Sequence, residues 1–300
     1  MRLDDLRPTE NVDDRRGQDG GFGGTGLGGR HIVMGGGGLG LVAFIVIALL
    51  ANGGDVGGLL NEVAGGGQST LPYGPGQTQS QPASAEDQAA FEFSRKIIGS
   101  TEDVWTAILA KRGIQYQAAT FTPFTNATQT GCGEGQTVMG PFYCPSDHRV
   151  YIDLAFFNEL ATRFGAPGQF AQAYVLAHEI GHNVQNITGT MDNVQAQLSS
   201  GRGSGSTGAS VRLELQADCY AGVWAYAANQ KSHILETGDV EQGLAAATAV
   251  GDDTLQKETQ GRVAPDSFTH GTSDQRVRWF RRGLSTGDMD QCDTFSAATL

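Results

Sequence analysis

Basic residues are scarce in this chain of 300 residues, where 20 Lys and Arg stand against 32 Asp and Glu and give a formal net charge of −12. No cluster of basic residues offsets this balance. Nucleic acids and anionic lipid surfaces attract proteins through positive patches. The composition therefore argues against both as binding partners.

Charged residues are absent from residues 32–51. At ~1.5 Å rise per residue, a helix of this length crosses the hydrocarbon core of a bilayer. Five arginines precede the stretch, whereas the next basic residue after it is Arg95. By the positive-inside rule, we expect a single-pass signal anchor in the cell membrane, with a cytoplasmic N-terminus and an extracytoplasmic catalytic domain. A cleaved signal peptide is the alternative.

The segments on either side of this stretch have the composition of unfolded chain. Residues 1–31 are rich in Gly, Asp and Arg and lack an apolar period, which predicts a disordered cytoplasmic leader. Residues 52–85 are rich in Gly, Gln, Ser and Pro, which is typical of a linker. Residues 86–300 remain, and this length suffices for one packed domain.

Cysteine is also scarce, and the four cysteines show no Cys-x-x-Cys spacing, so a tetrathiolate zinc site is not expected. All four follow the predicted membrane span, and an even number fits disulfides in an oxidising compartment. Of the three pairings that four cysteines allow, we predict Cys132 with Cys144 and Cys219 with Cys292. The first pair closes a Gly-rich loop, and the second joins a predicted helix to the C-terminal tail.

The strongest motif is His178-Glu179-Ile180-Gly181-His182. Apolar residues recur at three- and four-residue steps over residues 170–186, which predicts a buried helix. On a helix, His178 and His182 lie one turn apart and can bind one metal ion, with Glu179 beside it as general base and acid. Gly181 indicates that another element approaches this helix closely. A pair of hydrogen-bonded core histidines is the alternative interpretation.

A catalytic zinc ion usually takes three protein ligands, so a third is needed. A second helical pattern over residues 211–228 carries Glu214 and Asp218 four residues apart, on one side of the helix. Asp218 stands among small apolar residues, where an unpaired carboxylate is costly to bury. We therefore predict Glu214 as the third ligand and Asp218 as the acceptor that orients the ring of His178 or His182. A solvated helix face is the alternative.

These motifs resemble those of the gluzincin metallopeptidases and, more closely, those of the bacterial neutral zinc metallopeptidase family, a set of membrane-anchored proteins. The matching stretches are residues 140–145, 150–157, 177–183, 214–222 and 267–276. They extend over most of residues 86–300. The resemblance implies an α+β, zincin-like fold, one zinc ion and a peptidase-type site, and it does not imply a particular substrate.

The segment Thr269-His270-Gly271 is similar to the Thr-His-Pro segment of gluzincins related to the membrane-embedded CAAX proteases, with Gly in place of Pro. A histidine at such a position can stabilise the oxyanion that develops during peptide hydrolysis. We therefore expect His270 to be a catalytic donor and Arg276 to be a supporting charge, paired with Asp218 or a neighbouring carboxylate. An ordinary loop histidine is the alternative for His270.

The residues that follow Arg149 alternate and favour a strand. In zincins, the strand before the metal-binding helix is the sheet edge on which an extended peptide lies. We expect the substrate-binding edge strand at Val150, Tyr151, Ile152, Asp153 and Leu154. An interior strand of the core is the alternative.

Taken together, the sequence predicts a membrane-anchored zinc metallopeptidase that acts on a peptide or protein substrate. A helix over residues 89–110, a small sheet and two metal-binding helices are expected to form its domain. Two alternatives stay open. One is a zinc-binding envelope protein without proteolytic activity, and the other is a zinc hydrolase that acts on cell-wall peptide amides.

Overall fold

The computed structural model describes residues 1–18, 84–199, 203 and 205–300. The predicted membrane span at residues 32–51 lies outside these residues, as does nearly all of the predicted linker. Within the described residues, no helix combines the length and apolarity needed to cross a membrane. Membrane anchoring therefore stays a prediction.

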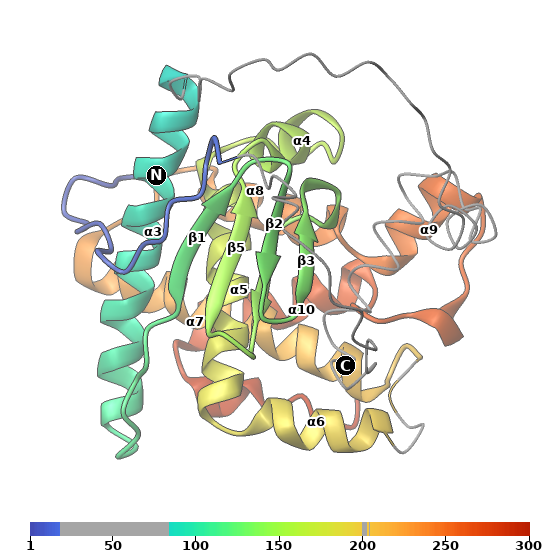
Figure 1. The fold of residues 1–300 in the computed structure, drawn as a ribbon. Helices are drawn as coiled ribbons and strands as arrows, with labels where there is room; N and C mark the ends of the chain where they lie inside the picture. Colours follow the sequence, from blue (N-terminus) through green and yellow to red (C-terminus); the bar gives the residue numbers. More distant parts are fainter. Residues whose placement is uncertain (19–83, 200–202, 204) are drawn as a thin grey trace, which may run out of the picture.

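A three-stranded sheet lies in front of the helices in Figure 1. Its strands are β1 Thr120–Phe124, β5 Arg149–Asp153 and β4 Phe142–Cys144, in the order β1-β5-β4. β5 pairs parallel with β1 and antiparallel with β4. A separate hairpin joins β2 Ala127–Thr130 to β3 Gly133–Gln136 and is followed by the short helix η1 Thr137–Met139.

The strand predicted as the substrate edge is in fact an interior strand. β5 has a neighbour on each side, so its main-chain groups are already paired, and the edge strands of the sheet are β1 and β4. The prediction is wrong because the order of strands in a sheet depends on contacts between distant segments. β4 has three residues, too few to show a period of its own.

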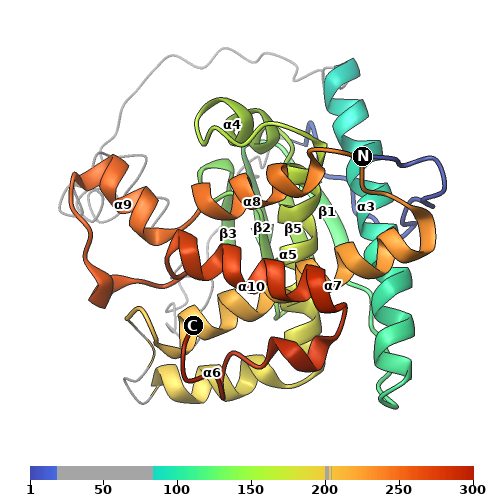
Figure 2. The ribbon, with the colours of Figure 1, turned by 180° about the vertical axis from the view of Figure 1, so that it is seen from behind.

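The helices complete an α+β domain. They are α3 Ala85–Ala110, α4 Phe156–Thr162, α5 Gln169–Ile187, α6 Thr190–Ser199, α7 Ala209–Ser232, α8 Asp239–Ala249, α9 Asp252–Gln260 and α10 Ser273–Thr286, with short 3-10 turns η2 Pro265–Ser267 and η3 Met289–Cys292. α5 lies between the sheet and a layer formed by α7, α8 and α10, which faces the viewer in Figure 2. α3 packs along the side, against α5, α7 and β1.

Glycines allow the central helices to cross closely. A Cβ at Gly181 of α5 would lie 3.1 Å from the Cα atom and the carbonyl oxygen of Ala217 on α7. On the other side of α7, a Cβ at Gly222 or at Gly283 would collide with main-chain atoms across the contact with α10. The close approach that Gly181 suggested is therefore present, and it brings α7 beside the helix that carries the two predicted histidine ligands.

Residues 1–18, here called the N-terminal arm, pack against the domain. The arm runs parallel to β1, and Phe121 donates its main-chain N–H to the Asn11 carbonyl at 2.9 Å. Leu6 and Thr9 are buried. Arg16 binds Asp87 at 2.7 Å and stacks over the ring of Phe91.

The expectation of a disordered leader is therefore wrong for residues 1–18. An extended arm is held by main-chain hydrogen bonds and by ion pairs, and these require no apolar period. Gly99 contributes from the domain side, because a Cβ there would collide with the Arg7 carbonyl as the arm crosses α3. Residues 19–31 lie outside the described residues.

Candidate metal centre

Three side chains from two helices meet beside α5. His178 and His182 come from α5, and Glu214 comes from the first turns of α7. One ligand atom from each lies within 4.8 Å of the others. His178 Nε2 is 3.2 Å from Glu214 Oε2, and His182 Nε2 is 3.6 Å from Glu214 Oε1. The helical spacing and the Gly181 crossing thus bring the three predicted ligands together.

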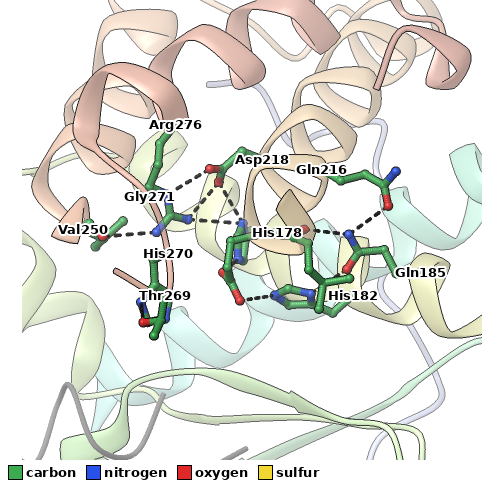
Figure 3. A network of polar contacts seen from close by, with 12 residues as sticks. His178, His182, Gln185, Gln216, Asp218, Val250, Thr269, His270, Gly271 and Arg276 are labelled. Atoms are coloured by element: carbon green, nitrogen blue, oxygen red, sulfur yellow. Dashed lines mark hydrogen bonds and ion pairs between the residues drawn. The ribbon is translucent and has the colours of Figure 1, made fainter. Parts of the chain in front are cut away.

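The outer nitrogen of each imidazole faces an acceptor (Figure 3). His178 Nδ1 lies 2.9 Å from Asp218 Oδ1, and His182 Nδ1 lies 2.8 Å from Gln185 Oε1. Because a carboxylate oxygen and an amide oxygen accept hydrogen bonds, each Nδ1 carries the proton. Each Nε2 then presents a lone pair to Glu214, which is the tautomer that metal binding requires.

A divalent cation fits this arrangement. Without one, two nitrogen lone pairs and a carboxylate would face one another. Burial lowers the pKa of His178, but Asp218 and Glu214 outweigh this effect and raise it to about 10, so the ring attracts a second proton on Nε2. Burial raises the pKa of Glu214, whereas the three neighbouring histidines hold it well below its usual range. Two imidazoles and one carboxylate also form a donor set of zinc sites that keep an open position.

Asp218 is the centre of a buried polar network. Its carboxylate accepts hydrogen bonds from Tyr174 Oη at 2.5 Å and from the Arg276 guanidinium at 2.8 and 2.9 Å, besides that from His178. Arg276 and Asp218 are 4% and 0% exposed. Burial raises the pKa of Asp218, but Arg276 and His178 outweigh it and lower the pKa overall. Asp218 is thus charged and holds the ring of His178 in place.

Glu179 lies on α5 next to the cluster of predicted ligands, His178, His182 and Glu214, and is buried. Burial raises its pKa, and the neighbouring imidazoles offset part of this effect, so that the pKa stays above its ordinary value. The main-chain N–H of Tyr143 in β4 hydrogen-bonds its carboxylate. Tyr143 is itself fixed, because its hydroxyl donates to Asn183 Oδ1 at 3.0 Å. β4 is thereby held against the helix that carries the predicted base.

His270 lies in the loop before α10, and a second carboxylate orients it. Asp252, at the start of α9, accepts the main-chain N–H groups of Thr269, His270 and Gly271 at 2.7, 2.7 and 3.0 Å. Its other oxygen is 3.2 Å from His270 Nδ1. Burial lowers the pKa of His270, but Glu214 and Asp252 outweigh this and raise it.

Two disulfides join Cys132 to Cys144 and Cys219 to Cys292, as predicted. Cys219 follows Asp218 on α7, so the second bond ties this helix to η3 near the C-terminus. The main chain there also accepts a hydrogen bond from Gln216, at 3.1 Å from the Cys292 carbonyl. The disulfide and this hydrogen bond therefore fix α7, which carries Glu214 and Asp218, against η3.

A cleft of about 1540 Å³, including its part open to solvent, contains the cluster. His178, Glu179, His182 and Glu214 line it, as do His270 and Arg276. Its rim includes the β2–β3 hairpin, η1 and β4. These six predicted site residues therefore share one cavity, whereas Asp218 and the residues of β5 do not line it.

Sequence reasoning missed Asp252, Tyr174, Gln185 and Tyr143. Tyr174 precedes His178 by four residues and Gln185 follows His182 by three, so helical spacing carried a usable signal for both. Asp252 stands in a Gly-Asp-Asp run that looks like an ordinary helix start. Its role depends on the fold of a distant loop, which no local pattern specifies.

Comparison with known proteins identifies the family of this chain but no solved structure that resembles it. A family model described as "Putative neutral zinc metallopeptidase" matches residues 1–295. "Uncharacterized protein YpfJ" of Escherichia coli is 44% identical over 297 residues, which cover 98% of this chain and 99% of that protein. "Uncharacterized protein Rv2575" of Mycobacterium tuberculosis is 43% identical over 238 residues, which cover 75% of this chain and 78% of that protein. No solved structure matches the chain.

Proposed function

We propose that this chain, which belongs to the neutral zinc metallopeptidase family, hydrolyses peptide bonds with one zinc ion held by His178, His182 and Glu214. The observation that carries the proposal is the position of Glu179. A buried carboxylate lies beside three side chains that could bind one metal ion, in the cleft where a substrate has access to them. Zinc, when bound, supplies a Lewis acid that polarises a carbonyl group and acidifies water.

Glu179 moves the proton in this mechanism. Its carboxylate takes one proton from the attacking water as the water oxygen bonds to the scissile carbon. It then delivers this proton to the leaving nitrogen as the C–N bond breaks, which yields an amine and a carboxylic acid. The Tyr143 N–H limits the orientations of the carboxylate.

His270, which Asp252 orients, stabilises the negative charge that develops on the carbonyl oxygen. Asp252 faces Nδ1 of His270, which leaves Nε2 to donate a hydrogen bond into the cleft. A donor that is already oriented requires no rearrangement when the oxyanion forms. Arg276 acts through Asp218, since it neutralises the carboxylate that orients His178.

We further propose that β4 is the strand that receives the peptide main chain. It is an edge strand of the three-stranded sheet, and it lines the cleft through Phe142 and Tyr143. An extended peptide can add to an unpaired strand edge through main-chain hydrogen bonds.

The experiment uses the zinc-loaded, full-length chain with a diverse peptide pool, and mass spectrometry identifies new termini. We expect new termini from the wild type and from Glu241→Gln, an exposed matched control, and none from Glu179→Gln with zinc still bound. Cleavage by Glu179→Gln would refute the mechanism. Stoichiometric zinc without any cleavage would favour a zinc-binding envelope protein, and release of products from cell-wall fragments alone would favour the amide hydrolase.

The packing of the N-terminal arm on the domain indicates on which side of the membrane both lie. Residues 1–18 pack on the domain, and a single membrane crossing between them would separate the two. Two disulfides favour an oxidising compartment. We therefore propose that the arm and the domain both lie outside the cytoplasm, in place of the predicted single crossing with a cytoplasmic N-terminus. A membrane-impermeant maleimide should label both Asp5→Cys in the arm and Asn193→Cys in the domain on cells with a sealed cytoplasmic membrane. Labelling of Asn193→Cys alone would contradict this arrangement.

A further inference from the structure

The cleft beside the metal cluster is apolar along most of its wall. Among the described residues that line the cleft, Glu134 is the one acidic or basic side chain besides those already assigned to the site, which are His178, Glu179, His182, Glu214, His270 and Arg276. A charged substrate side chain would lose water there and find little to replace it. The lining thus selects against charge before any specific contact is considered.

One apolar group lies toward the α4 end of α5. This α4 patch consists of Phe156, Phe164 and Val175. The two phenylalanine rings lie 6.2 Å apart between centroids. Val175 is one turn before His178 on the same helix, so the patch is adjacent to the metal cluster on that side.

A second apolar group lies toward the α6 end of α5. This α6 patch consists of Met191 and Leu213. Met191 is the second residue of α6, and the carbonyl of Leu213 accepts a hydrogen bond from Gln185 near the C-terminal end of α5, at 2.7 Å. α4 and α6 lie at opposite ends of α5 in both views (Figures 1 and 2). His178, Glu179 and His182 therefore lie between the two patches.

We infer that the substrate is a peptide with bulky apolar side chains on both sides of the scissile bond, one seated on each patch. This inference rests on the proposed function. The scissile carbonyl has to lie at the cluster, so the residues that precede and follow it extend toward opposite ends of α5. Burial of an apolar side chain on each patch removes apolar surface from water.

The test begins with peptides that differ at the two positions flanking the cleaved bond. With full-length, zinc-loaded protein, we expect Leu, Phe or Met at each position to give a kcat/KM at least ~10-fold higher than Ala, Asp or Lys, in the range that pocket contacts supply. A preference for charged or small residues at either position would overturn the inference.

Charge placed on each patch makes the test specific. Phe164→Glu should gain cleavage next to Lys or Arg on one side of the scissile bond, and Met191→Glu should gain it on the other side. Asn158→Glu on α4 and Asn193→Glu on α6 are matched controls at exposed positions outside the cleft, and should keep the wild-type preference. Gains on the same side, or no gain from either variant, would overturn the two-patch assignment.

Binding separates this inference from the proposed function. The Glu179→Gln protein, loaded with zinc, is titrated with fluorescently labelled peptides of both kinds. Tighter binding of the doubly apolar peptides, weakened by Phe164→Glu and by Met191→Glu in that background, would support the patches even if the wild type cleaves nothing. Equal binding of apolar and charged peptides would overturn them even if the wild type is an active peptidase.

Discussion

Replacement of Asp218 by Asn keeps the shape of the buried network and removes the negative charge that His178, Tyr174 and Arg276 share. In the native structure, both oxygens of Asp218 bind Arg276, and the residue is 0% exposed. The variant leaves the Arg276 guanidinium buried without a countercharge, which costs about 3–5 kcal/mol. It also weakens the acceptor that orients a metal ligand, which typically lowers metal affinity by ~10–100-fold.

Two measurements on full-length protein check these values. Denaturant unfolding of the metal-free protein should show a free energy of unfolding lower by about 3–5 kcal/mol. Competition with a chromophoric chelator should show the ~10–100-fold loss of zinc affinity. Asp103→Asn is the control, because Asp103 pairs with Arg7 and Lys231 at the surface, and it should change stability by at most about 1 kcal/mol and leave zinc affinity unchanged.

A double variant separates the two effects. Asp218→Asn combined with Arg276→Met removes both charges, so the unpaired buried cation is gone and most of the lost stability should return. Zinc affinity should stay low, because the ring of His178 still lacks its carboxylate acceptor. Native zinc affinity in Asp218→Asn, or equal instability of the single and double variants, would refute this account of the network.

Three further outcomes are expected. Asp252→Asn should lower kcat on a cleaved peptide and leave KM nearly unchanged. The loss should be smaller than the ~10²–10³-fold expected for His270→Ala, because the variant weakens the orientation of the His270 donor and does not remove it. Unchanged kcat would contradict this role. Gly99→Val should speed hydrogen exchange in residues 1–18, because its side chain collides with the arm, whereas Ala107→Val on the exposed face of α3 should leave exchange slow. The pKa of Asp13 is lowered, because Arg15 and Arg149 outweigh its burial; its contribution to arm docking is therefore complete above its ordinary pKa of 3.8 and is lost as the pH falls through the lowered value. The protection of the amides in residues 1–18, relative to their intrinsic exchange rate at each pH, should stay constant from pH 7 down to about pH 4. Loss of this protection near pH 6 would contradict the prediction.

The site residues that were predicted correctly from the sequence are those whose positions follow from helical periodicity. His178, His182, Glu214 and Asp218 lie at four-residue spacings, and such spacings place side chains on one helix face whatever the rest of the fold does. Burial of Asp218 among small residues then indicated a partner. The structure supplies the predicted partner, His178, whose Nδ1 lies 2.9 Å from Asp218 Oδ1, and also Arg276, which the sequence analysis gave as one option.

The missed features depend on contacts between distant segments. β5 has the composition of a strand, but its interior position follows from β1 and β4, which lie on either side of it. Asp252 matters because three main-chain N–H groups of a loop near residue 270 converge on it. The prediction of disorder failed for the arm because its polar residues form ion pairs with distant partners. Arg16 pairs with Asp87, 71 residues away, and Asp13 pairs with Arg149, 136 residues away.

Gly181 connects the fold to the chemistry. It lies between the two proposed histidine ligands on α5, and its missing side chain lets the α7 main chain approach at Ala217, next to Asp218. Metal sites tolerate changes in ligand distance of about 0.2 Å, which is less than the displacement that a methyl group at this contact would impose on packed helices. The glycine lowers helix propensity by about 1 kcal/mol relative to Ala, and its position in the motif is explained by this crossing. The residue that weakens the helix locally is therefore the one that lets the carboxylates of α7 reach the imidazoles of α5.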